Sequence, residues 1–121
     1  MKMTTIRLKA LSVNDSWRGR RFKTQEYKDY EYGLSFLLPT FLKIPKGKLK
    51  LEILVGFSSK ASDLDNILKP FIDVLQKKYK FNDNRIYKLK IEKEIILKGK
   101  EFIKFKIKRY GKKNGKIEWD F

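Results

Sequence analysis

Alternating apolar and polar residues in the stretch LKLEILVGF, residues 49–57, limit the folds open to this chain more than any other feature. Successive side chains of a β-strand point to opposite faces, so this period of two predicts a strand with one apolar face. Similar alternation occurs in residues 4–11, 85–97 and 101–110. The last two stretches are separated only by the short segment KGK, which predicts an antiparallel hairpin.

Two other segments have apolar residues at helical spacing. Thr24 can cap a helix that runs to about residue 38, where Pro39 ends it. A second helix is predicted over residues 66–79, with Pro70 near its first turn. The residues expected to face the core are Tyr27, Tyr30, Leu34 and Leu37 in the first helix, and Ile67, Phe71, Val74, Leu75 and Tyr79 in the second.

The resulting order of elements is strand, helix, strand, helix, strand, strand. This order predicts an α+β fold in which a mixed sheet of about four strands carries two helices packed on one face. The length of 121 residues fits one domain, which we expect over residues 1–110, followed by a basic tail at 111–121.

The composition excludes several kinds of chemistry. The chain has no His and no Cys, so disulfides, Cys-ligated zinc and His-dependent catalytic triads are excluded. Any metal must be held by oxygen ligands, which favours Mg2+, Mn2+ or Ca2+. We see no signal peptide, and no apolar run approaches the ~20 residues of a membrane span. We therefore expect a cytoplasmic protein with no membrane partner.

The chain is strongly basic. It has 30 Lys and Arg residues against 14 Asp and Glu residues, which gives a net charge of +16. A small domain with this charge usually binds a polyanion, and nucleic acid is the first candidate. A solvated basic surface is the alternative explanation.

Acidic residues are nevertheless concentrated in SDLDNILKPFID, residues 62–73, which holds three of the seven aspartates. If the backbone is extended there, Asp63 and Asp65 point the same way, and a divalent cation would relieve their repulsion. Alternatively, Asp65 or Asn66 caps the helix, and Lys69 and Asp73 form an exposed pair one turn apart. At this spacing Asp65, Lys69 and Asp73 share one helical face.

A further aspartate, Asp83, follows the second helix in the loop FNDN. A straight helix of about fourteen residues is ~20 Å long and would carry Asp83 far from Asp65. Asp83 can approach Asp65 only if its loop or the next strand runs back along the helix, which the spacing alone does not establish.

The motif DLDNILKPFID followed by NDNRI resembles the signature of the RusA family of Holliday junction resolvases. The segment SVNDSWRGRRFKT resembles that family's N-terminal segment, and the resemblance spans residues 6–110. It implies a homodimeric nuclease, of bacterial or phage origin, that cuts branched DNA, above all four-way junctions, with Mg2+ or Mn2+. By position, Asp63, Asp65 and Asp83 match the family's essential acids, expected to hold the metal, and Lys69 matches its essential lysine. Asn82 replaces the first acid of a pair, so the site would carry one negative charge fewer.

The residues expected to contact DNA lie in three places. Lysines on one face of the last strand could bind phosphates or could protect a sheet edge. The N-terminal loop offers arginines and a tryptophan that could contact the DNA backbone or stack on bases, or could be solvated and packed under the loop. The full set, with one residue from the acidic motif, is Asn14, Trp17, Arg18, Arg20, Arg21, Asn66, Lys104, Lys106 and Lys108.

Three functions agree with these features. The first is a metal-dependent endonuclease that resolves four-way junctions by paired, symmetric nicks. The second is a non-catalytic basic module that binds junctions or RNA, and the third is a RusA-like protein that binds junctions without cutting them. The acids and the lysine favour the nuclease, because a module that only binds nucleic acid has no need to gather acidic residues.

Overall fold

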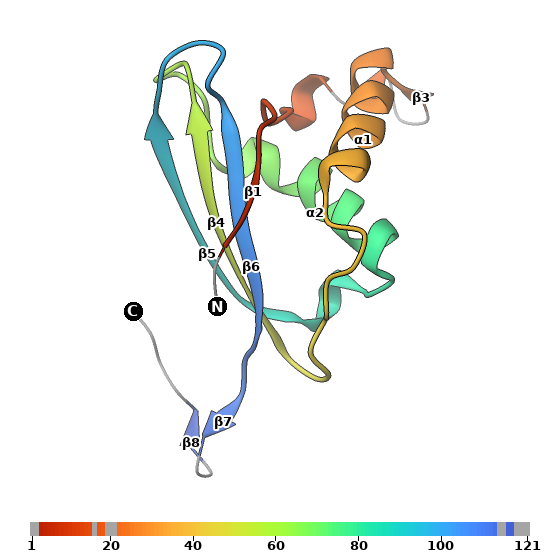
Figure 1. Ribbon diagram of the computed structural model, residues 1–121, viewed down its shortest axis with the longest axis vertical. Coiled ribbons are helices and arrows are strands. Elements are labelled where there is room, and N and C mark those ends of the chain that lie inside the picture. The colour runs from red at the N-terminus through yellow and green to blue at the C-terminus, as the bar shows by residue number, and fades with distance from the viewer. Residues whose placement is uncertain (1–2, 16, 19–21, 114–115, 118–121) are drawn as a thin grey trace.

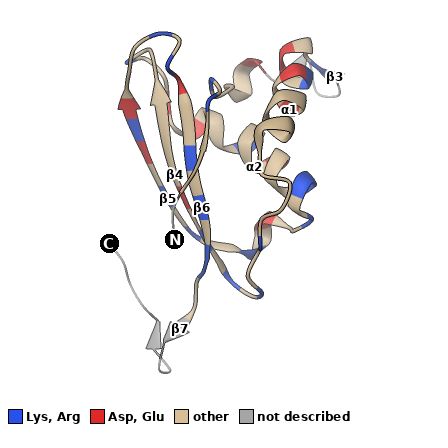
Figure 2. Cartoon of the chain, in the orientation of Figure 1, with Lys and Arg blue, Asp and Glu red and all other residues tan. Residues whose placement is uncertain are grey.

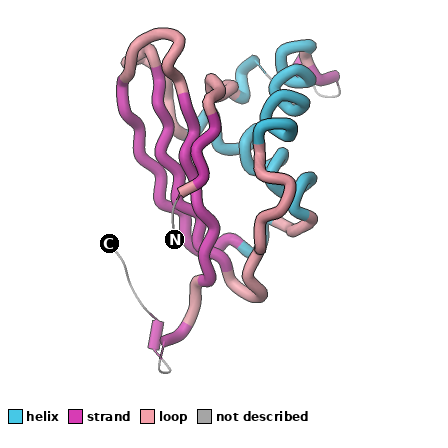
Figure 3. The backbone as a smooth tube through the Cα atoms, viewed as in Figure 1, coloured by secondary structure: helices cyan, strands magenta, loops and turns pink. Residues whose placement is uncertain are grey.

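The computed structural model describes residues 3–15, 17–18, 22–113 and 116–117. Within these residues a four-stranded sheet carries two α-helices on one of its faces (Figures 1 and 3). The α+β fold and its mixed sheet are therefore confirmed. In chain order the elements are β1 (Thr4–Ile6), a 3₁₀ turn (Val13–Asp15), β2 (Trp17–Arg18), β3 (Phe22–Lys23), α1 (Gln25–Leu37), β4 (Leu49–Phe57), α2 (Asp65–Tyr79), a second 3₁₀ turn (Asp83–Arg85), β5 (Ile86–Ile95), β6 (Phe102–Arg109), β7 (Lys112–Lys113) and β8 (Lys116–Ile117).

The strands of the main sheet lie in the order β1-β6-β4-β5. β5 runs parallel to β4, whereas β6 runs antiparallel to both β4 and β1. The predicted hairpin between the last two long strands is therefore wrong, because β4 lies between them. Alternation in the sequence shows which face of a strand is apolar, but it does not show which strands pair.

Burial explains why β4 takes a central position. Every residue of β4 except Leu54 is buried, which requires a neighbour on each edge. α2 carries the chain from the end of β4 back to its start, so β5 enters parallel to β4, as in other strand–helix–strand units. The N–H of Ile96 donates to the carbonyl oxygen of Phe57 at 2.8 Å, and the chain then crosses to the other edge of β4, where β6 begins.

The apolar core fills the space between the sheet and the helices. Phe71 of α2 meets Phe105 of β6 edge to face, with ring centroids 5.4 Å apart. β1 ends at Ile6 and is shorter than the strand predicted over residues 4–11. Leu8 and Ala10 lie beyond its end and still pack against the core, which explains the longer apolar pattern.

α1 begins and ends close to the predicted positions. Thr24 Oγ1 accepts a hydrogen bond from the N–H of Tyr27 at 3.1 Å, as expected of a helix cap. At the other end Leu38 has extended backbone angles (φ −65°, ψ 144°), which a residue before a proline prefers. Leu37 was predicted in the core but is 45 % exposed, because Leu38, just past the last helical turn, is the residue that becomes buried.

α2 buries four of the five apolar residues that the sequence predicted, and it also buries Pro70. The fifth, Tyr79, is only partly buried and packs against the core. Pro70 is the sixth residue of the helix rather than a member of its first turn, so it cannot donate to the carbonyl of Asn66. The helix ends at Tyr79, and the next residue, Lys80, has the left-handed conformation (φ 56°) that is common just after helix ends. Neither α-helix of the described chain is long and apolar enough to cross a membrane.

Gly56 of β4 lies against the ring of Phe102, on the face of the sheet that the helices leave open. A Cβ atom at this position would lie 2.4 Å from Cε1 of that ring. Because Phe102 is itself buried, its ring has little room to move away. This close approach of backbone and ring requires a glycine.

Gly56→Ala is therefore expected to lower the free energy of unfolding by about 1–3 kcal/mol through overpacking. Gly33→Ala is the matched control, because Gly33 lies within α1 and its new Cβ would meet nothing within 4 Å. The control should raise stability by about 0.5–1 kcal/mol, since alanine favours a helix interior over glycine. Urea unfolding followed by circular dichroism measures both changes, and equal effects at the two positions would contradict the close contact.

Candidate active site

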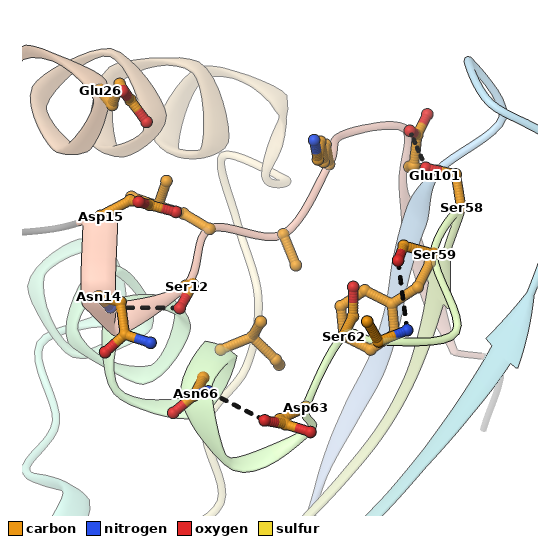
Figure 4. Close-up of a pocket in the computed structure, with 16 residues that line it drawn as sticks. Ser12, Asn14, Asp15, Glu26, Ser58, Ser59, Ser62, Asp63, Asn66 and Glu101 are labelled. Carbon is orange, nitrogen blue, oxygen red and sulfur yellow. Dashed lines mark hydrogen bonds between the residues drawn. The ribbon is translucent and has the colours of Figure 1, made fainter.

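A cleft of about 490 Å³ opens at the N-terminal end of α2 (Figure 4). Its walls come mainly from residues 9–15 after β1, from residues 57–63 at the end of β4, and from the first turn of α2. These segments meet because β4 leads directly into α2, while the 3₁₀ turn after β1 packs beside the same helix.

Asp63, Asn66 and Asn14 are the predicted site residues that line this cleft. Asn66 Nδ2 lies 3.5 Å from Asp63 Oδ2, so the amide and the carboxylate face each other (Figure 4). The N–H of Asn14 donates to Ser12 Oγ at 3.2 Å, which fixes the opposite wall.

The start of α2 differs from two expectations. Leu64 is the N-cap, and none of the described side chains caps the helix, so neither Asp65 nor Asn66 has that role. Leu64 also has helical backbone angles (φ −63°, ψ −41°), so Asp63 and Asp65 are not joined by extended backbone. Residues two apart on a helical turn do not face each other. Asp63 accordingly lines the cleft, whereas Asp65 is exposed in the first turn outside the cleft lining.

The cleft is acidic. Its described lining includes four carboxylates and one lysine, namely Asp15, Glu26, Asp63, Glu101 and Lys9. Glu101 has a structural role, because it accepts hydrogen bonds from Ser58 Oγ at 2.9 Å and from the N–H of Gly99 at 2.8 Å. Hydrogen bonds from its own backbone and from Ser58 hold the pKa of Glu101 below its ordinary value. A cleft of this charge favours a cation over a bare phosphate.

Lys69 and Asp73 lie one turn apart on α2, as predicted, but their surroundings differ. The Lys69 Nζ atom lies 3.5 Å from Asp73 Oδ2, and the two side chains are 67 % and 22 % exposed. The Asp73 carboxylate also accepts a hydrogen bond from the Tyr27 hydroxyl of α1 at 3.3 Å. Burial, together with the charge of Asp73, raises the pKa of Tyr27 to about 12, so this hydroxyl remains a donor at neutral pH. Asp73 therefore takes part in the contact between the helices.

Asp83 lies at the opposite end of α2 from Asp63 and Asp65. Its N–H donates to Gln76 Oε1 at 2.8 Å, and Gln76 follows Asp65 by eleven residues, or ~16 Å along the helix axis. β5 does run back toward the start of α2, but Asp83 precedes that strand. Across the described parts of the chain, no three acidic side chains are grouped as a metal site. The predicted grouping of all three aspartates is thus not found within one copy of the chain.

Asn82 shapes the loop that holds Asp83. Its side chain accepts a hydrogen bond from the N–H of Asn84 at 2.9 Å and caps the 3₁₀ turn Asp83–Arg85. Asn and Asp cap helical turns about equally well. The amide at this position therefore keeps the local backbone while carrying no charge.

The predicted DNA contacts of the N-terminal loop are described only in part. The backbone of Trp17 and Arg18 forms β2, which pairs with β3. Arg20 and Arg21 lie outside the described residues. Contact of this loop with DNA therefore stays a prediction.

Basic residues recur along β6 (Figure 2). Lys104, Lys106 and Lys108 alternate there with buried core residues, so they lie on the open face of the sheet, away from the helices. Glu52 of β4 stands among basic side chains there, with Oε2 3.0 Å from Lys106 Nζ and Oε1 3.2 Å from Lys50 Nζ. Burial alone would raise the pKa of Glu52, but the hydrogen bonds from Lys106 and Lys50 outweigh burial and lower it. This carboxylate partly offsets the basic charge of the face, whose contact with DNA also stays a prediction.

Some contacts around the site were missed because their partners are far apart in the sequence. Lys93 of β5 donates from Nζ to the carbonyl oxygen of Ser62 at 3.0 Å, next to Asp63. Only the parallel pairing of β5 with β4 brings Lys93 there, and alternation does not reveal that pairing. Tyr27 likewise reaches Asp73 across 46 residues of sequence, and no local pattern indicates this contact.

Comparison with known protein families finds a match. The family model described as Endodeoxyribonuclease RusA matches residues 12–116, which include most of the cleft lining, α2 and the loop of Asp83. A search of curated proteins finds no match.

Glu52→Gln is expected to lower the free energy of unfolding at pH 7 by about 1–3 kcal/mol, because an amide cannot replace the charged hydrogen bonds to the lysines. Folding lowers the pKa of Glu52, so its ionised carboxylate stabilises the folded state. This stabilisation is fully present at pH values above the pKa of Glu in the unfolded chain, about 4.3. The stabilisation is lost as the pH falls through the lower pKa that Glu52 has in the folded protein.

The gap between the urea midpoints of the wild type and Glu52→Gln should therefore shrink below about pH 4. Glu94→Gln, which alters an exposed side chain of β5, is the control and should change little. A gap of constant size from pH 7 to pH 3 would contradict this role for Glu52.

Proposed function

Because this chain belongs to the RusA family of endodeoxyribonucleases, we propose that it cuts four-way DNA junctions by metal-dependent hydrolysis, with one nick in each of two opposed strands. The observation that carries the proposal is an acidic cleft at the start of α2 in a chain of net charge +16. A protein that only binds nucleic acid gains nothing from such a cleft, because its carboxylates repel phosphates.

The start of α2 carries carboxylates, which are the kind of ligand that a hydrated divalent cation prefers. Mg2+ is usually held by one or two carboxylates, with water and substrate phosphates filling the remaining positions. Asp63, which lines the cleft, would be the first carboxylate ligand, and the exposed Asp65 side chain would have to turn toward the cleft to be the second. The Asn66 amide next to Asp63 would hold that carboxylate in place. When bound, such an ion supplies an activated water and neutralises charge on the phosphate under attack.

Lys69 would stabilise the phosphate during hydrolysis. Its ammonium group is exposed and lies one turn along α2 from Asp65. A positive group beside the phosphate lowers the barrier, because negative charge builds up on the phosphate oxygens in the transition state. The other basic residues, distributed over the open sheet face and the loops, would hold the DNA arms away from the acidic cleft.

Asp83 requires a second copy of the chain if it acts at the same phosphate. Within one copy it is separated from Asp65 by most of the length of α2. A four-way junction is nearly two-fold symmetric, and a C2 dimer offers two identical sites in the matching relation. We propose that in such a dimer each site combines Asp63, Asp65 and Lys69 of one copy with Asp83 of the other.

Wild-type protein is expected to nick a synthetic four-way junction in Mg2+ or Mn2+, but not in EDTA and not in linear duplex. Asp65→Asn should abolish cleavage while junction affinity in Ca2+ stays within about twofold, because binding depends on the basic surface. Asp29→Asn, which removes an exposed carboxylate of α1, is the charge-matched control. Cleavage by Asp65→Asn at the wild-type rate would contradict the metal site, and tight binding without any cleavage by the wild type would favour a protein that only binds junctions.

Mixed dimers test whether the site is shared between copies. Asp65→Asn and Asp83→Asn are each expected to be inactive alone. In a dimer with one copy of each variant, a shared site leaves one site with both aspartates, so single nicks should reappear. If both aspartates act within one copy, neither site is intact and the mixed dimer stays inactive. Differently tagged variants, co-expressed and purified through both tags, give the required sample.

A further inference from the structure

A row of hydrogen bonds follows the side of α2 that faces α1 and connects the two ends of the proposed site. Lys69 Nζ lies 3.5 Å from Asp73 Oδ1, and Gln76 Nε2 lies 3.5 Å from the same oxygen. The other end of the Gln76 amide, Oε1, accepts from the N–H of Asp83 at 2.8 Å. Two side chains that belong to neither the metal site nor the core thus connect Lys69 with the backbone of Asp83.

The orientation of the Gln76 amide is determined by its two partners. The N–H of Asp83 can only donate, and the Asp73 carboxylate can only accept. The amide oxygen must therefore face Asp83 and the amide nitrogen must face Asp73. A glutamate at position 76 would place an anionic oxygen against Asp73 with almost no change in shape.

Asp73 is anchored more firmly than an ordinary surface carboxylate. An exposed lysine and aspartate one turn apart contribute only about 0.3–0.5 kcal/mol and leave both side chains mobile. Here the carboxylate is mostly buried and also accepts a hydrogen bond from the Tyr27 hydroxyl of α1. Tyr27 is itself buried in the core, so the position of Asp73 is set by the packing of the two helices.

We propose that Asp73 and Gln76 are positioning residues, which hold the Lys69 ammonium group and the Asp83 backbone in fixed places along α2. The proposal rests on the proposed nuclease function, because it assigns a purpose to the fixed positions of Lys69 and Asp83. Asp73 restricts a lysine that is otherwise free to move in solvent. Gln76 restrains the loop that presents Asp83, together with the cap formed by Asn82.

The alternative is a purely structural role, in which Asp73 and Gln76 only join the helices and the following loop. The two roles differ in what a substitution changes. Loss of a structural contact lowers stability, and any loss of activity follows the loss of folded protein. Loss of a positioning contact lowers the rate of the folded enzyme at unchanged affinity for DNA.

The first measurement does not depend on activity. In Asp73→Asn, relaxation of the ¹³Cε methylene of Lys69 should report increased motion, while Lys28 on α1 serves as the reference within the same sample. In Gln76→Leu, which removes the acceptor oxygen while keeping a similar side-chain size, the backbone amide of Asp83 should exchange with solvent at least tenfold faster, whereas the amide of Asn84, bonded to Asn82, should change less. Unchanged motion of Lys69 and unchanged exchange at Asp83 would overturn the proposal.

The second measurement is single-turnover cleavage of the four-way junction. Asp73→Asn and Gln76→Glu should each lower the rate by about 10–100-fold, the range seen when supporting groups of a site are removed. Junction affinity in Ca2+ should stay within about twofold. The matched controls are Asp29→Asn and Gln25→Glu, because Gln25 Nε2 also donates to an aspartate on its own helix, Asp29 Oδ1, at 2.8 Å.

The outcomes separate the two proposals. If the wild type cuts and the variants cut at the control rate, or if affinity and rate fall together, the positioning role is overturned while the nuclease function stands. If the wild type does not cut the junction in Mg2+ or Mn2+, the nuclease function fails, and the relaxation and exchange data still decide whether Asp73 and Gln76 restrain their neighbours.

Discussion

The burial of β4 on both of its faces is the constraint on which the rest of this structure depends. The side chains on its helix side form the centre of the apolar core. On its open side Lys50, Glu52 and Gly56 are also buried, against side chains of the neighbouring strands. That second face explains why Glu52 is surrounded by lysines and why a glycine lies under the Phe102 ring. It also explains the topology, because a strand with no exposed edge needs a partner on each side.

The position of the proposed site follows from this central strand. β4 ends where α2 begins, and the aspartates lie in that connection and in the first turn of the helix. α2 then extends the site along its length, with Lys69 on the second turn, Asp73 on the third and the Asp83 loop beyond its end. One helix therefore carries both halves of the proposed chemistry, but it holds them too far apart to act on a single phosphate within one copy.

Much of the fold could be predicted from the sequence, because helices and single strands are marked by local patterns. The Thr24 cap, the stop at Pro39 and the core residues of α2 all follow from the spacing of neighbouring residues. Strand pairing could not be predicted in this way, since β5 and β6 alternate as two hairpin strands would.

The candidate site was also only partly predictable from local patterns. The acids and Lys69 were predicted from two short motifs close together in the sequence, whereas the contacts of Tyr27 with Asp73 and of Lys93 with Ser62 join residues that are distant in sequence. The extended backbone considered for Asp63 and Asp65 is not found, because the helical conformation begins one residue before Asp65.

Asn82 has a consequence for how such a site can change during evolution. Its side-chain oxygen caps the turn before Asp83, and an aspartate would present the same oxygen in the same place. Exchange between the two residues, which requires a single nucleotide substitution, alters the charge of the loop by one unit without altering the path of the backbone. The charge that residue 82 presents to DNA and the geometry of the loop are thus independent at this position. Selection can change the charge while the geometry of the loop stays the same.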